Sequence, residues 1–133
     1  MEPLPTPTWD VMILNFDGHA PRPIASFRPG RGSLPMGPAA VVRSAIDGAL
    51  ADIDWSDPGR GILDDDGGAT HLEIDLGAEG VLDGFMIHAR GRRGAAPLIA
   101  HLCLVNGWAA LDVARGVFLD LDEPETWESG GRV

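Results

Sequence analysis

The chain has 133 residues and a mass of 14.1 kDa, which favours a single domain that buries about two-thirds of its unfolded surface. Its 20 acidic and 10 basic residues give a formal net charge of −10 and a pI of about 4.5. This charge disfavours nucleic acid and anionic membranes as partners and favours a basic protein. Cys103 is the only cysteine, which excludes an intrachain disulfide and a multi-cysteine metal site.

No stretch of the sequence predicts a secretion signal or a membrane segment. The N-terminus lacks both a basic region and an apolar run of signal-peptide length. No segment approaches the roughly 20 apolar residues that span a bilayer. We therefore expect a cytoplasmic protein.

The first predicted element is a strand at residues 8–16. Val11 and Ile13 fall on one side of its alternation, and Met12 and Leu14 fall on the other. A strand that is apolar on both sides is expected in the interior of a sheet. It is followed by a stretch crowded with Pro, Gly and Arg.

That stretch, residues 17–37, is a Pro/Gly/Arg-rich loop. A run of this length without regular structure is uncommon inside a compact domain. The composition is compatible with a mobile loop and with a binding segment that orders on contact with a partner.

Helical periodicity marks residues 38–53 and 95–106. In the first segment an apolar stripe follows Pro38, and polar side chains lie away from it. In the second, Pro97 fits a first helical turn, where its missing N–H costs nothing, and the pair at 106–107, Asn-Gly, is a stop signal. Cys103 falls in this helix and is expected to be a small buried hydrophobe.

The clearest strand signal is a two-residue period in residues 70–76 and 82–90. Apolar side chains on one side alternate with polar ones on the other, which is typical of strands covered on one face only. The expected core side carries Leu72, Ile74, Leu76, Phe85 and Ile87. The expected polar side carries His71, Glu73, Asp75, His88 and Arg90.

Shorter strands complete the expected set. Residues 60–63 fit a short edge strand after a turn at 54–59, and residues 108–112 and 117–120 fit a hairpin. Together the elements predict an α+β fold, an antiparallel sheet of five or six strands with two helices packed on one face. Residues 1–133 then form one domain. The expected core consists of Ile13, Val42, Ile46, Leu50, Leu72, Ile74, Phe85, Ile87, Leu98, Leu102 and Leu111.

The polar side of the two alternating strands is the first candidate site. If the strands pair, His71, Glu73 and Asp75 lie beside His88 and Arg90. Imidazole next to carboxylate serves general acid–base catalysis, and two histidines with a carboxylate can hold a metal ion. Alternating polar residues are also what any half-solvated antiparallel sheet shows. We favour a solvated, protein-binding face and expect neither a cofactor nor a metal.

Two turns carry strong charge. Asp64, Asp65 and Asp66 offer several oxygens to a hard cation such as calcium, but their spacing is not that of an EF-hand loop, and an acidic hairpin turn is the favoured interpretation. The arginine-rich turn at residues 90–94 resembles an anion cradle before a helix. We favour instead a role for its arginines as ion-pair partners of the surplus carboxylates.

Two residues of the predicted hairpin are further candidates. If Trp108 shares the polar face with Met86 and His88, an exposed aromatic ringed by acids forms a binding hot spot. Asp112 is expected to add to the acidic surface.

Several short motifs together resemble a family of small uncharacterised bacterial proteins. The motifs are WSDP at residues 55–58, GI at 61–62, LEI at 72–74, HARG at 88–91, WAALD at 108–112 and FLDL at 118–121. Such proteins are similar in size and charge to the immunity proteins that neutralise toxins delivered between bacteria. The resemblance implies no catalytic residue, and the arginine-rich turn here is more basic than the usual glycine-rich version.

The leading functional hypothesis is a non-enzymatic inhibitor that binds a cognate toxin through its acidic surface and covers a cationic site. One alternative is a small hydrolase that uses His71 and His88. Another is an acidic antagonist of phage type that imitates nucleic acid.

Overall fold

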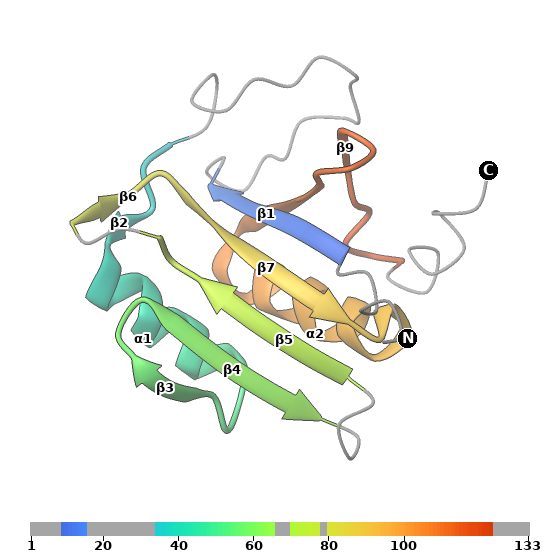
Figure 1. Ribbon diagram of the computed structural model, residues 1–133. Coiled ribbons are helices and arrows are strands. Elements are labelled where there is room, and N and C mark those ends of the chain that lie inside the picture. The colour runs from blue at the N-terminus through green and yellow to red at the C-terminus, as the bar shows by residue number, and fades with distance from the viewer. Residues whose placement is uncertain (1–8, 16–33, 66–69, 78–79, 124–133) are drawn as a thin grey trace, which may run out of the picture.

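The computed structural model describes residues 9–15, 34–65, 70–77 and 80–123. Asp66 and most of the predicted loop at residues 17–37 lie outside these described residues. The described part is an α+β fold with one large antiparallel sheet, a small second sheet and two helices (Figure 1). The predicted fold class is confirmed.

The large sheet has seven strands in the order β3-β4-β5-β7-β1-β8-β9, and every neighbouring pair is antiparallel. Its strands are β1 (Trp9–Asn15), β3 (Asp54–Asp57), β4 (Arg60–Asp65), β5 (Thr70–Asp75), β7 (Gly84–Arg90), β8 (Trp108–Asp112) and β9 (Val117–Phe118). A two-stranded sheet pairs β2 (Gly37–Pro38) with β6 (Val81–Leu82). As predicted, β1 lies inside the sheet, hydrogen-bonded on both sides.

Two helices, α1 (Ala39–Ala49) and α2 (Arg92–Asn106), lie behind the sheet as it is seen in Figure 1. Neither of these two helices lies over the face turned to the viewer. The main core fills the space between the sheet and the helices. It includes Val11, Ile13, Val42, Ile46, Leu72, Ile74, Phe85, Ile87, Ile99 and Leu102.

A second, smaller apolar cluster lies on the other side of the sheet. It contains Leu14, Ala109, Leu111 and Phe118, all buried, with Met12 packed against them. Leu111 therefore belongs to this cluster and not to the main core in which it was expected. Leu98 is only partly buried at the edge of the main core. The other predicted core residues are buried as expected.

The second helix begins earlier than the sequence pattern predicts. Gly91 adopts a left-handed conformation (φ 75°) and caps the helix, so that Arg92 is its first residue and Pro97 lies inside it. The first turn presses Gly94 against the side chain of Thr70, so closely that a Cβ at this position would overlap the threonine hydroxyl. Packing on β5 therefore sets the start of α2. Pro97, which the sequence pattern placed in the first turn, does not mark that start.

The edge of the sheet also differs from expectation. Residues 54–57, expected as part of a turn, form the edge strand β3, and β4 lies one strand further in. The ring of Trp55 packs against the core, and its indole N–H donates to Asp47 on α1 (2.7 Å). These contacts outweigh the turn preference of the aspartates. Among the residues that the structure describes, no helix is long enough and apolar enough to cross a bilayer.

Candidate functional site

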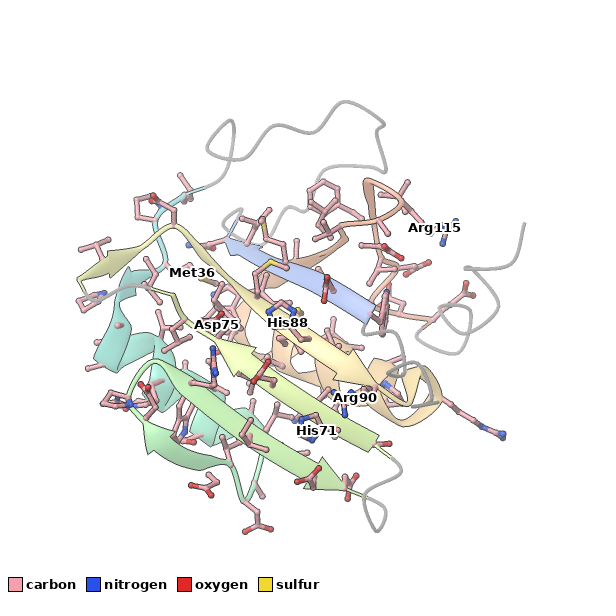
Figure 2. The ribbon with its side chains drawn as sticks, in the orientation of Figure 1. Met36, His71, Asp75, His88, Arg90 and Arg115 are labelled. Atoms are coloured by element: carbon pink, nitrogen blue, oxygen red, sulfur yellow. The ribbon has the colours of Figure 1, made fainter. Side chains whose placement is uncertain are left out.

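The candidate site is the open face, which we define as the side of the seven-stranded sheet opposite α1 and α2. Strand register places its side chains in rows that run across the strands. One row joins Asp64, His71 and Arg90; the next joins Ile62, Glu73, His88 and Asp10; a third joins Arg60, Asp75, Met86, Met12 and Leu111. Figure 2 shows His71, Asp75, His88 and Arg90 projecting from this face. The five polar residues predicted to share a face therefore do so.

Two histidine–aspartate pairs bridge neighbouring strands of the open face. Nδ1 of His71 lies 2.6 Å from Oδ1 of Asp64, and Nδ1 of His88 lies 2.7 Å from Oδ1 of Asp10. A carboxylate only accepts hydrogen bonds, so Nδ1 is the donor in each pair and Nε2 stays outside the bond. The His71 side chain is 28% exposed and the His88 side chain is 29% exposed. The pairs orient both imidazoles without removing them from solvent.

The open face is acidic. Its carboxylates are Asp10, Asp64, Glu73 and Asp75, and its arginines are Arg60 and Arg90. Arg60 lies 3.7 Å from Glu73 in a partly exposed ion pair, a contact of small energetic weight. Acids still exceed arginines.

Two of the three arginines of the arginine-rich turn, Arg90 and Arg93, do not form the ion pairs expected of them with the residues that the structure describes. Within the described part of the chain, neither Arg90 nor Arg93 has a carboxylate at ion-pair distance. Both side chains are exposed. The prediction that they neutralise the surplus carboxylates is wrong for these two residues.

Part of the open face is apolar and hollow. Where β5 ends and β7 begins, a cavity of about 280 Å³ is lined by Met12, Leu14, Asp75, Leu76, Gly77, Asp83, Gly84, Phe85 and Met86. The acidic rows and this apolar hollow therefore share one surface.

Two predicted contributors do not belong to this surface. Trp108 lies on the helix side and packs edge-on against Phe85, with ring centroids 5.6 Å apart. Asp112 lies on the same side and is 1% exposed, because it pairs with Val11 of the core face. Its carboxylate accepts hydrogen bonds from the Trp9 indole (3.3 Å) and the Arg115 backbone (3.2 Å). Neither residue can contact a partner directly, and their predicted roles are corrected to structural ones.

The acidic turn is divided by the structure. Asp64 joins the open face through His71. Asp65 pairs in register with Thr70, whose side chain is buried, so Asp65 belongs to the helix-side alternation of β4. It lines a separate hollow with His101. The third aspartate, Asp66, lies outside the described residues.

The chemistry open to this face is limited. Its central strands β1, β4, β5, β7 and β8 carry no serine or cysteine, and their one threonine, Thr70, is buried on the helix side. Burial raises the pKa of the Cys103 thiol to about 12, so this thiol is not a nucleophile near neutral pH. Among the described residues no cluster of three or more His, Cys, Asp or Glu is placed to hold a metal ion. The His–Asp pairs could activate a water molecule, and the carboxylates could bind cations.

Sequence reasoning missed Asp10 and Arg60 as contributors to the face, and Asp83 as a residue that lines its hollow. Asp10 meets its histidine across 78 residues of chain, and a single aspartate beside an apolar strand gives no local signal of that pairing. Comparison of the chain with known protein families, with curated proteins and with solved structures finds no match.

Proposed function

We propose that this chain is a non-enzymatic protein-binding module of the cytoplasm, an immunity protein that binds a cognate bacterial toxin and occludes a cationic site on it. The observation that carries the proposal is a sheet face that neither α1 nor α2 covers and on which, among the described residues, acids exceed arginines. The surrounding molecule has a net charge of −10. A positively charged partner would be steered to such a molecule and held at this face.

The geometry of the face suits rigid recognition. Its side chains stand on hydrogen-bonded strands, and Asp10, Asp64 and Glu73 are each held by a neighbour on the next strand. Side chains that are already oriented lose less conformational entropy on binding. The acids would therefore pair with basic side chains of the partner and cover a site that ordinarily receives an anion.

The proposal is tested by capture of the partner from the native host. The full chain should recover one dominant basic protein, and capture should weaken as salt is raised. The double variant D64N/E73Q removes two charges from the open face and should weaken binding by about tenfold. The matched control D52N/D65N removes two exposed charges at the hollow lined by residues of the helix side and should bind as the wild type does. Asn suits position 52, where φ is 63°.

If the capture experiment recovered only this chain, without a partner protein, the result would argue against the proposal. Equal weakening of binding by the two double variants would also argue against it. Binding would then depend on the net charge of the molecule and not on the open face.

A second candidate is hydrolysis by activated water, which the two His–Asp pairs favour. An oriented imidazole with Nε2 outside the Asp bond is the arrangement of a general base. In that case H71A or H88A should lower turnover on a panel of ester and phosphoester substrates by about a hundredfold, with partner capture unchanged. Turnover that is absent in the wild type, or that neither H71A nor H88A lowers, would rule out this candidate.

A further inference from the structure

The hollow of about 280 Å³ on the open face combines two kinds of lining. Its apolar wall includes Met12, Leu14 and Met86, contributed by the adjacent strands β1 and β7. Two carboxylates, Asp75 and Asp83, also line it. Apolar walls beside paired negative charges suit a ligand that is aliphatic along its length and cationic at its end.

The two carboxylates are available to such a ligand. Oδ1 of Asp75 accepts the backbone N–H of Gly77 (2.9 Å), which fixes the carboxylate and leaves Oδ2 outside this bond. Asp83 is exposed, and within the described part of the chain no hydrogen bond or ion pair engages its side chain. Both carboxylates can therefore accept hydrogen bonds from a cationic ligand without first breaking an internal ion pair.

We propose that this hollow is the anchor site for one arginine side chain of the basic partner. The inference rests on the proposed function and names the group that the open face would hold most firmly. The aliphatic stem would pack on Met12 and Met86, and the guanidinium would pair with Asp75 and Asp83. Long basic side chains bury their stems and keep their charged ends in water, and methionine adapts its shape to the group it contacts.

Other occupants fit less well. A purely apolar side chain would leave two carboxylates beside it without a counter-charge. The volume lies just below the roughly 300–1,000 Å³ typical of sites for drug-sized molecules. Arginine is favoured over lysine because its planar fork has five donors for two carboxylates and is more weakly hydrated.

Gly84, which lines the hollow, lies in close contact with β1. A Cβ on Gly84 would lie 2.9 Å from the carbonyl oxygen of Ile13 and 2.9 Å from the side chain of Leu14. The absence of a side chain at this position therefore lets β1 and β7 pair closely where they line the hollow.

The test follows methyl groups of the full chain by NMR. Methionine is labelled with ¹³C at its methyl group, and the resonances of Met12, Met86 and Met36 are assigned. Met36 does not line the hollow and packs against the main core. Titration with Nα-acetyl-arginine methylamide should shift the first two resonances saturably and leave the Met36 resonance in place.

Matched compounds and variants isolate the two parts of the site. Nα-acetyl-norleucine methylamide has the stem without the charge and should bind at least about threefold more weakly; the lysine analogue should fall between the two. D83N should weaken arginine binding by about two- to fivefold. D122N, which removes a different exposed carboxylate, should leave arginine binding unchanged.

The absence of a saturable shift, equal binding of the norleucine compound, or unchanged binding by D83N would each overturn the anchor site. The outcome is independent of partner capture. Capture that depends on Asp64 and Glu73 without arginine binding would overturn this inference alone. Arginine binding without capture would overturn the proposed function alone.

Discussion

Replacement of Gly94 by alanine is expected to lower the free energy of unfolding by about 1–3 kcal/mol. The new methyl group would overlap the Thr70 side chain, which is itself 2% exposed and enclosed at the start of β5. Either Thr70 must change its position inside the core or the first turn of α2 must move away from the sheet. Urea denaturation followed by tryptophan fluorescence measures the change, with an unaltered dependence on denaturant expected.

A matched control for this variant is Gly48→Ala. Gly48 also lies in a helix, but it is exposed, and a Cβ there would have no neighbour within 4 Å. Alanine at this position should raise the free energy of unfolding by about 0.5–1 kcal/mol, because glycine has the lower helix propensity. If both variants changed stability by the same amount and sign, the close approach of α2 to β5 would be contradicted.

Replacement of Asp112 by alanine is also expected to lower the free energy of unfolding by about 1–3 kcal/mol. The carboxylate is 1% exposed and accepts hydrogen bonds from the Trp9 indole and the Arg115 backbone, so it ties β8 to the N-terminal strand and to the following turn. The variant loses both contacts at once. Thermal and urea unfolding measure the loss.

The control for Asp112→Ala is Asp65→Ala, since Asp65 is exposed. Its effect should stay within about 0.5 kcal/mol of the wild type. Folded D112A protein should still capture the partner as the wild type does, since Asp112 does not reach the surface. A variant that remained fully stable but lost the partner would return Asp112 to the binding role that its sequence position suggested.

The sequence predicts the two faces of the sheet well where alternation is strict. In β5 polar and apolar side chains alternate without interruption, and in β7 the core side is apolar throughout, so His71 and His88 could be placed on one face before their strands were known to pair. The same periodicity located both helices. These features depend on residues that are neighbours in the chain.

The sequence-based predictions are wrong where a contact between distant residues determines the local structure. In β8 the alternation is weak because small alanines occupy both faces, and pairing with β1 places Trp108 and Asp112 on the helix side. The start of α2 depends on contact with Thr70, and the edge strand β3 depends on contacts with Asp47 and the core. None of these contacts leaves a periodic signal in the sequence.

The position of β1 between β7 and β8 has a consequence for how the chain folds. This strand precedes both of its partners in the chain, residues 84–90 and 108–112, and its Trp9 is hydrogen-bonded to Asp112, 103 positions away. Large sequence separation of this kind slows folding, because the entropy of closing long loops is lost before the strand pairing stabilises the chain. On the ribosome, β1 cannot pair with its second neighbour until β8 has emerged. We therefore expect the N-terminal strand to be inserted late, into a gap that the rest of the molecule has formed.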